Sequence, residues 1–303
     1  MEWNQEEQAW TSDDRSSKDV TDATPSTPLE ANSSYKDDSR CIAVEADMPV
    51  DWNADEYNMQ HKRRGHAVIF NHDMFETRNY APREGSHIDV ENLREAFSSL
   101  LFDVTIHNNL EYSKIKKVIT ALAEEDHSDA DCIAVIVLTH GEENGLLVPR
   151  DSSIFYSVDI LWKPFTADKC PTLAGKPKLF FIQACRGREL DAGIKMKQQR
   201  GTRTEFDSSP SPYKIPTHAD FLIAYSTMEG FYSFRNLDTG TWFIQSLCKE
   251  LNSTDNLLQI LTRTTRRVTQ LESDSNVKQF HKQKQVPSIT SMLTRDLHFH
   301  PKS

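Results

Sequence analysis

A histidine and a cysteine each follow a run of apolar residues, and together they could support nucleophilic catalysis. His140 directly follows IAVIVLT, and Cys185 directly follows KLFFIQA. An imidazole beside a thiol can take up its proton and produce the thiolate, which is the reactive form of cysteine. Taken alone, a cysteine after a strand is more often an inert core thiol, and a histidine there is more often structural. No other cysteine or histidine has a zinc-like spacing to either residue, so we expect no metal.

Alternating strands and helices would bring these two residues to one edge of a sheet. Apolar runs predict strands, and apolar residues spaced by three and four predict helices. The predicted strands are residues 65–70, 102–106, 133–139, 178–183, 220–226 and 286–294. The predicted helices lie at residues 90–100, 115–122, 241–251 and 256–271. This order predicts an α/β fold with a mostly parallel central sheet flanked by helices on both faces. Active sites in such folds form at the carboxyl ends of strands. A purely structural role would not explain why both His140 and Cys185 lie at this edge.

Composition and charge exclude several classes of protein. The chain has 303 residues and a net charge of −10, which argues against general binding to nucleic acid or to a membrane surface. It contains no run of about 18 apolar residues, and its N-terminus is unlike a secretory signal. Its five cysteines are odd in number and widely spaced, which predicts free thiols in a reducing compartment. We therefore expect a cytoplasmic protein.

The N-terminal segment differs in composition from the rest of the chain. Residues 1–40 hold ten acidic and four basic residues and are dominated by Ser, Thr, Asp and Pro. A segment with so few large apolar side chains cannot offset its chain entropy by burial, so we predict that it is disordered. Residues 41–60 are transitional in composition, and we place the end of the N-terminal linker at residue 56.

The sequence around Cys185 and His140 resembles the caspase family. Gln183-Ala184-Cys185-Arg186-Gly187 matches the caspase cysteine signature, whose histidine lies about 50 residues upstream. His140-Gly141-Glu142 is similar to the histidine loop of that family. The similarity extends over roughly residues 57–298 and is greatest to insect effector (executioner) caspases. It implies a caspase-like fold made of a large and a small subunit after processing.

The resemblance implies a cysteine endopeptidase that cuts proteins after aspartate and needs no cofactor. Cys185 would be the nucleophile and His140 its acid/base partner. The backbone N–H groups of Gly141 and Cys185 would bind the oxyanion. A backbone carbonyl orients the histidine in this family, and by alignment it would be that of Ala81.

The resemblance also implies a basic pocket for aspartate and further subsites. Arg83, Gln183 and Arg235 would bind the carboxylate, since two guanidinium groups can hold it through paired hydrogen bonds. The remaining expected substrate-binding residues lie on the loop after the fifth predicted strand and beyond it: Tyr232, Ser233, Phe234, Asn236, Trp242 and Phe280. Of these, Tyr232, Phe234 and Phe280 would contact the residue next to the aspartate, and Asn236 and Trp242 the residue three before it.

Four features depart from the usual pattern of the family. Phe234 replaces a usual Trp, and Asp274 replaces an aromatic residue of some executioner caspases. Ser86-His87 stands where Thr followed by Asp or Asn is common, and the His140 loop is one residue longer than usual. These departures bear on subsite preference more than on the chemistry.

The resemblance further implies a zymogen. We expect residues 1–56 to form a prodomain and linker, 57–207 the large-subunit part and 208–303 the small-subunit part. Activating cleavage is expected after Asp207 (TEFD, before Ser208) and after Asp22 (DVTD, before Ala23). The weaker alternatives for cleavage are Asp191 between the subunits and Asp38 and Asp47 in the prodomain.

Several partners follow from the same resemblance. They are protein substrates with acidic cleavage motifs, an upstream initiator caspase and a second copy of the chain, giving a homodimer of two large/small pairs. Cleavage after Asp22 would expose Ala-Thr-Pro-Ser, which resembles the N-terminal motifs that inhibitor-of-apoptosis proteins bind. We expect no nucleic-acid and no membrane partner.

Two other functions are compatible with the same fold. A catalytically inactive caspase-like scaffold or decoy would lack activity, although all the expected catalytic positions are intact. A related peptidase that cuts after Arg or Lys would need an acidic primary pocket, and Arg83 with Arg235 argue against it.

Overall fold

The computed structural model describes residues 46, 48–152, 154–193 and 216–302. These residues belong to one compact unit that contains a six-stranded sheet in the order β2-β1-β3-β4-β5-β8. The first five strands run parallel, and β8 is antiparallel to β5. The strands are β1 (His66–Asn71), β2 (Asp103–Asn108), β3 (Ile133–Leu138), β4 (Lys178–Gln183), β5 (Phe221–Tyr225) and β8 (Ser288–Ser291). The prediction of a mostly parallel α/β sheet is confirmed.

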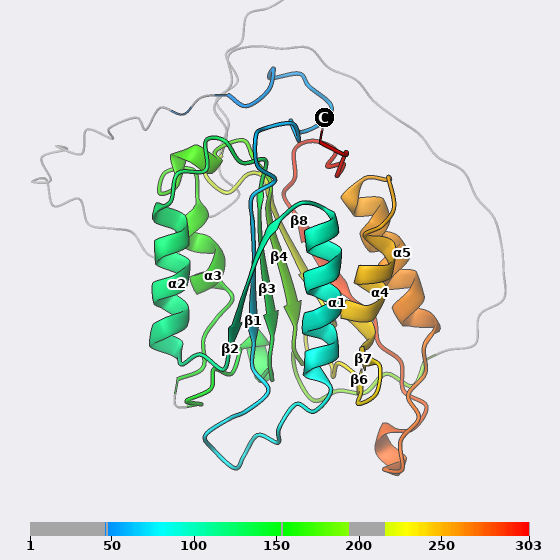
Figure 1. The fold of residues 1–303 in the computed structure, drawn as a ribbon. Helices are drawn as coiled ribbons and strands as arrows, with labels where there is room; N and C mark the ends of the chain where they lie inside the picture. Colours follow the sequence, from blue (N-terminus) through cyan, green and yellow to red (C-terminus); the bar gives the residue numbers. More distant parts are fainter. Residues whose placement is uncertain (1–45, 47, 153, 194–215, 303) are drawn as a thin grey trace, which may run out of the picture. The chain divides into compact units, whose positions relative to one another are not determined.

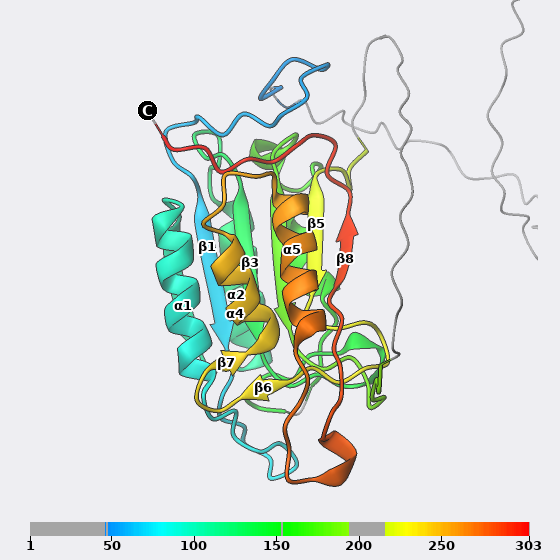
Figure 2. The same ribbon diagram turned by 90° about the vertical axis from the view of Figure 1, so that its right-hand side faces the viewer.

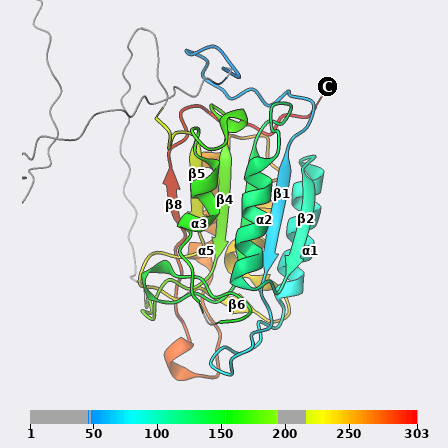
Figure 3. The same ribbon diagram turned by 90° about the vertical axis from the view of Figure 1, so that its left-hand side faces the viewer.

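Helices cover both faces of this sheet, as Figure 1 shows. On one face lie α1 (Ser86–Ser99), α4 (Trp242–Glu250) and α5 (Leu257–Gln270), and on the other lie α2 (Tyr112–Glu124) and α3 (Asp159–Trp162). Figure 3 shows α2 and α3 in front of the strands. No helix among the described residues is long and apolar enough to cross a membrane.

Strand β3 shows why the sheet is buried on both faces. Ala134, Ile136 and Leu138 enter the core beneath α1, α4 and α5, whereas Ile133, Val135 and Val137 enter the core beneath α2 and α3. Successive side chains of a strand point to opposite faces, so a strand covered on both sides must be apolar throughout. The unbroken run IAVIVL meets this requirement, and all six residues are fully buried.

The short elements were not predicted. Strands β6 (Arg235–Asn236) and β7 (Gly240–Thr241) form a hairpin with only two residues in each strand, and α3 has only four residues. Segments of this length contain no complete hydrophobic period, so periodicity does not identify them. The predicted longer elements are present, with ends that differ by at most four residues, and the bounds of β4 agree at both ends.

A buried carboxylate joins three distant parts of the chain at the amino-terminal edge of the sheet. Asp131 Oδ2 accepts hydrogen bonds from Arg64 Nη1 (3.0 Å) and Lys302 Nζ (2.6 Å), and its Oδ1 accepts one from the His61 backbone N–H (2.7 Å). The side chains of Asp131 and Arg64 are 0% and 1% exposed. Removing one partner of a buried ion pair leaves the other charge without compensation.

Replacement of Asp131 by alanine should therefore lower the free energy of unfolding by about 3–5 kcal/mol. Urea denaturation of the purified chain measures this change. The matched control is Asp129→Ala, which removes a carboxylate two residues away from a half-exposed pair with Arg63. The control should hardly shift the urea midpoint, because exposed ion pairs contribute little. Equal shifts for the two variants would contradict the proposed role of the Asp131 network.

Candidate active site

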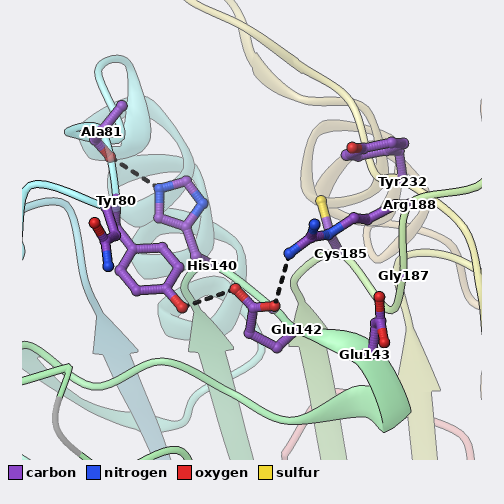
Figure 4. Close-up of a pocket in the computed structure, with 11 residues that line it drawn as sticks. Tyr80, Ala81, His140, Glu142, Glu143, Cys185, Gly187, Arg188 and Tyr232 are labelled. Carbon is purple, nitrogen blue, oxygen red and sulfur yellow. Dashed lines mark hydrogen bonds and ion pairs between the residues drawn. The ribbon is translucent and has the colours of Figure 1, made fainter.

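His140 lies on the loop after β3 and packs against two aromatic rings, which also contact each other. The imidazole centroid lies 4.9 Å from the ring of Phe75 and 5.6 Å from that of Tyr80. Its Nε2 is 2.8 Å from the carbonyl oxygen of Ala81, the residue expected to orient it. When Nε2–H donates to this carbonyl, the other ring nitrogen is free to accept a proton, and Figure 4 shows that nitrogen on the side of the ring toward Cys185. The geometry thus suits a histidine that acts as a base.

The Cys185 thiol lies at the carboxyl end of β4, on the neighbouring strand. Its Sγ is 3.5 Å from the backbone N–H of Ser233 and 3.8 Å from the carbonyl of the same residue. Burial raises the pKa of the Cys185 thiol, against the opposing effects of Ser233 N–H, Arg83 and Arg235. Burial likewise lowers the pKa of His140, the Ala81 carbonyl opposes this, and the two arginines lower it further. At neutral pH the unliganded site therefore holds a neutral thiol and a neutral imidazole.

The backbone at Gly141 passes unusually close to Cys185. A Cβ atom at this glycine would lie 1.8 Å from the Cys185 carbonyl oxygen, so no other residue fits without movement of the backbone. Gly141 faces Leu147 across an antiparallel bridge whose hydrogen bonds are made by the flanking residues, from Glu142 N–H and Val148 N–H. Within the described chain, neither Gly141 N–H nor Cys185 N–H donates a hydrogen bond. Both groups are available to bind an oxygen of a ligand.

Two arginines and a glutamine lie beside the thiol. The Arg83 side chain is buried, and its Nη1 donates to the His72 carbonyl (3.0 Å) and to Ser86 Oγ (3.1 Å). Burial and the charge of Arg235 lower the pKa of Arg83 to about 10, so it stays charged at neutral pH. Gln183 Nε2 donates to Ser233 Oγ (2.8 Å).

This group of side chains has unused hydrogen-bonding capacity. Gln183 Oε1 and Arg235 Nε are buried, and neither has a hydrogen-bond partner among the described residues. Buried polar atoms without partners are costly and rare in native proteins. Their presence here indicates a site that is completed by a ligand.

All the expected substrate-binding side chains meet in one cavity of about 480 Å³. Its wall contains two aromatic pairs, Tyr232 with Phe280 (centroids 5.5 Å apart) and Phe234 with Trp242 (5.0 Å). Asn236 lies on β6 at the same wall, where its side chain also accepts hydrogen bonds from the turn that follows. The cavity is lined by Arg83, Thr139, His140, Gln183, Ala184, Cys185, Tyr232, Ser233, Phe234, Arg235, Asn236, Trp242, Glu272, Ser273, Asp274, Ser275 and Phe280.

A second, smaller cavity of about 200 Å³ is also lined by His140 and Cys185 (Figure 4). Tyr80, Glu142 and Arg188 line it, and sequence reasoning did not single them out for the site. Tyr80 Oη donates to Glu142 Oε1 (2.7 Å), and Glu142 Oε2 lies 3.6 Å from Arg188 Nη2. Burial and the Glu142 carboxylate raise the pKa of Tyr80 to about 12, so its hydroxyl stays a donor.

The Tyr80–Glu142 hydrogen bond joins the loop that carries the Ala81 acceptor to the loop that carries His140. We call this connection the loop clamp. The only sign of this contact in the sequence is that Glu142 stands two residues after His140, because its partner Tyr80 lies 62 residues away.

Asp89 was also not identified from the sequence. Its Oδ1 accepts hydrogen bonds from Thr241 N–H (2.9 Å) and Gln245 Nε2 (2.9 Å). Thr241 is the partner of Arg235 in the β6–β7 hairpin, so Asp89 fastens the hairpin that carries this arginine. A Cβ at Gly240, where φ is +88°, would lie 2.4 Å from Asp89 Oδ1, which explains the glycine.

Other expectations stay untested by the geometry. The expected cleavage residues Asp207 and Asp22 lie outside the described residues. Within the described ranges, no group of three or more His, Cys, Asp or Glu side chains could hold a metal ion.

The chain is similar to proteins of one known family. The family model described as the caspase domain matches residues 64–298. The chain is 52% identical over 261 residues to Caspase-1 of Spodoptera frugiperda, covering 84% of each chain. It is 49% identical over 262 residues to Caspase drICE of Drosophila melanogaster, covering 85% of this chain and 76% of the relative. The crystal structure of the Spodoptera frugiperda Caspase-1 aligns with a TM-score of 0.79 at 49% identity, covering 86% of this chain and 99% of that one.

Loss of the loop clamp should slow turnover more than it weakens substrate binding. Tyr80→Phe keeps the ring beside His140 but removes the hydrogen bond to Glu142. We expect kcat for a peptide substrate to fall about three- to tenfold, the equivalent of one hydrogen bond, while KM changes little. Steady-state kinetics measure both constants.

The control is Tyr112→Phe, which removes a hydroxyl from α2, remote from the site. It should leave kcat unchanged. Unaltered kcat in Tyr80→Phe would show that the clamp does not position His140.

Proposed function

This chain belongs to the caspase family, and we propose that it is an effector caspase, a cysteine endopeptidase that cleaves proteins after aspartate in apoptosis. The observation that carries the proposal is the convergence in one cavity of a thiol, an imidazole and a buried basic pocket. The relatives named above support the effector type. A cytoplasmic location is part of the same proposal.

In the proposed mechanism Cys185 attacks the carbonyl carbon of the substrate aspartate. His140 takes up the thiol proton as the C–S bond forms and then donates it to the leaving amine. The products of this step are the released C-terminal fragment and a thioester between Cys185 and the aspartate. A water molecule, deprotonated by His140, then attacks the thioester, which releases the N-terminal fragment and restores the thiol.

The backbone N–H groups of Gly141 and Cys185 would stabilise the oxyanion of both tetrahedral intermediates. The close approach of Gly141 to Cys185 and the absence of partners for the two N–H groups in the described chain support this assignment. Fixed donors of this kind contribute on the order of 3 kcal/mol each to transition-state stabilisation in other hydrolases.

Selectivity for aspartate would come from Arg83, Arg235 and Gln183. Two charged guanidinium groups held near each other repel, and a substrate carboxylate removes this repulsion. Arg235 Nε also has no partner within the described residues, so the carboxylate would satisfy a buried donor. Tyr232, Phe234 and Phe280 would contact the residue next to the aspartate, and Asn236 and Trp242 the residue three before it, with Ser233 as a further substrate-binding residue.

The enzyme would be made as a zymogen. Cleavage after Asp207, by the enzyme itself and by an upstream initiator caspase, would separate residues 57–207 from residues 208–303, and cleavage after Asp22 would remove the N-terminal residues. The mature form would be a homodimer of two large/small pairs. The new N-terminus at Ala23 would bind inhibitor-of-apoptosis proteins through its α-amino group and its small side chain.

A catalytically inactive scaffold is the main alternative. The intact dyad and the unused polar atoms of the basic pocket favour an enzyme.

The nucleophile and the cleavage sites can be tested together with the full-length chain. The active chain should turn over a reporter peptide that ends in aspartate and should yield fragments that begin at Ser208 and Ala23. Cys185→Ala should do neither and should fold normally, because the change is small and local. Reporter fluorescence and N-terminal sequencing measure the two outcomes.

Cys248→Ala is the matched control, since it removes a half-buried thiol of α4 away from the site. It should retain activity. Substantial turnover by Cys185→Ala would refute the mechanism, and other fragment ends would refute the assigned cleavage sites.

The pKa directions of the dyad predict a wide pH optimum. Below the pKa of His140 the imidazole is already protonated and cannot take up the thiol proton. Above the pKa of Cys185 the thiol has lost its proton, so none remains to be donated to the leaving amine. The first of these pKa values lies below the ordinary 6.5 and the second above the ordinary 9.0. In a profile of kcat/KM, the acidic limb should therefore fall below pH 6.5 and the basic limb above pH 9. The aspartate of the substrate stays ionised across this range, since its pKa is about 4. An acidic limb above pH 6.5 would contradict the neutral resting pair.

A further inference from the structure

The cavity that contains the two arginines also contains two acidic side chains. Glu272 and Asp274 belong to the segment between α5 and β8, which projects past the carboxyl edge of the sheet (Figure 2). Arg83 and Arg235 lie near Cys185, whereas Glu272 and Asp274 come from this separate segment. The cavity is thus lined by groups of opposite charge from different parts of the chain.

The acidic segment is held in place by a buried serine. Ser273 N–H donates to the Gln283 carbonyl (3.0 Å), and Ser273 Oγ donates to the Phe280 carbonyl (2.6 Å). The Lys282 N–H donates to the Ser273 carbonyl (2.7 Å). Glu272 and Asp274 flank this anchored residue, so their backbone is fixed while their carboxylates face solvent.

The two carboxylates are largely uncompensated. Asp274 is 99% exposed, and its nearest ionisable partner is His281, whose Nδ1 lies 3.4 Å away. Glu272 forms no ion pair with any other described residue. The buried, unpartnered atoms of Gln183 and Arg235 in the same cavity point to a ligand there, and under the proposed function that ligand is the substrate whose aspartate they bind.

The sequence of the chain indicates the charge of that ligand. Lys18 stands four positions before Asp22, and Arg203 stands four positions before Asp207. The three weaker cleavage candidates Asp38, Asp47 and Asp191 have Ser34, Ala43 and Gly187 at the corresponding position. The two favoured cleavage sites therefore share a cation that the others lack.

We propose that Glu272 and Asp274 form a subsite that selects a lysine or arginine four residues before the scissile aspartate. The proposal rests on the proposed function, and it names the class of substrate: segments that carry a cation at one end and an aspartate at the other. An extended peptide advances about 3.3 Å per residue, so a residue four positions upstream lies well away from the arginines, toward the far part of the cleft. Because the carboxylates are exposed, the selection is moderate and weakens with salt.

The test compares three reporter peptides, Xaa-Asp-Val-Thr-Asp with Xaa as Lys, Gln or Glu. For the mature enzyme at low salt, kcat/KM should be about three- to tenfold higher for Lys than for Glu, with Gln between them and the difference mainly in KM. The double variant Glu272→Gln with Asp274→Asn should bring the three values together. The control Glu95→Gln with Glu124→Gln makes the same change in net charge outside this cavity and should keep the wild-type ratio.

A second measurement uses the chain itself as substrate. Mature enzyme should cut the Cys185→Ala chain after Asp207 several-fold more slowly when Arg203 is replaced by Glu. Arg200→Glu, three residues earlier, should have little effect. Equal rates for the Lys and Glu peptides, or an unchanged ratio in the Glu272/Asp274 variant, would overturn the subsite and leave the proposed function intact. If no aspartate peptide is cleaved, the proposed function itself fails, and the subsite with it.

Discussion

The pairing of β3 with β4 is the constraint on which the site depends. Leu138 and Gln183 are register partners at the ends of these strands, and Thr139 N–H continues the ladder by donating to the Gln183 carbonyl (3.1 Å). The two strands therefore end at the same level of the sheet, and His140 and Cys185 each lie two residues beyond these register partners. A shift of one residue in either strand would exchange the side chains that fill the two cores and would separate the pair.

The electrostatics of the site are local and do not follow from the net charge. The chain is acidic, yet two arginines lie side by side near the thiol, where burial and mutual repulsion lower the pKa of Arg83. The buried Asp89 lies close enough to favour the charged form of both arginines. The pocket is thus held in a charged state with hydrogen-bonding capacity to spare, which suits a ligand that brings its own negative charge.

Loops from distant parts of the chain supply the other residues of the site. The segment after β1 supplies Arg83 and the Ala81 carbonyl, the segment after β3 supplies His140, and the β6–β7 hairpin supplies Arg235. The Tyr80–Glu142 hydrogen bond joins the first two of these segments. The hydrogen bond from Thr241 N–H to Asp89 fixes the hairpin. Tight backbone approaches at Gly141 and Gly240 make these contacts possible.

The sequence by itself determined the sheet, its helices and the position of His140 and Cys185 at strand ends, because these depend on local periodicity and on the short motifs around both residues. Resemblance added the Ala81 carbonyl and the basic pocket residues; in the structure this carbonyl contacts His140, and Arg83, Gln183 and Arg235 line one cavity with Cys185. Only the tertiary structure decided the loop clamp, the Asp89 anchor and the placement of Glu272 and Asp274 in the cleft. Each of these contacts joins residues far apart in the chain, and the pairing of such residues follows from how loops pack in space and leaves no periodic pattern in the sequence.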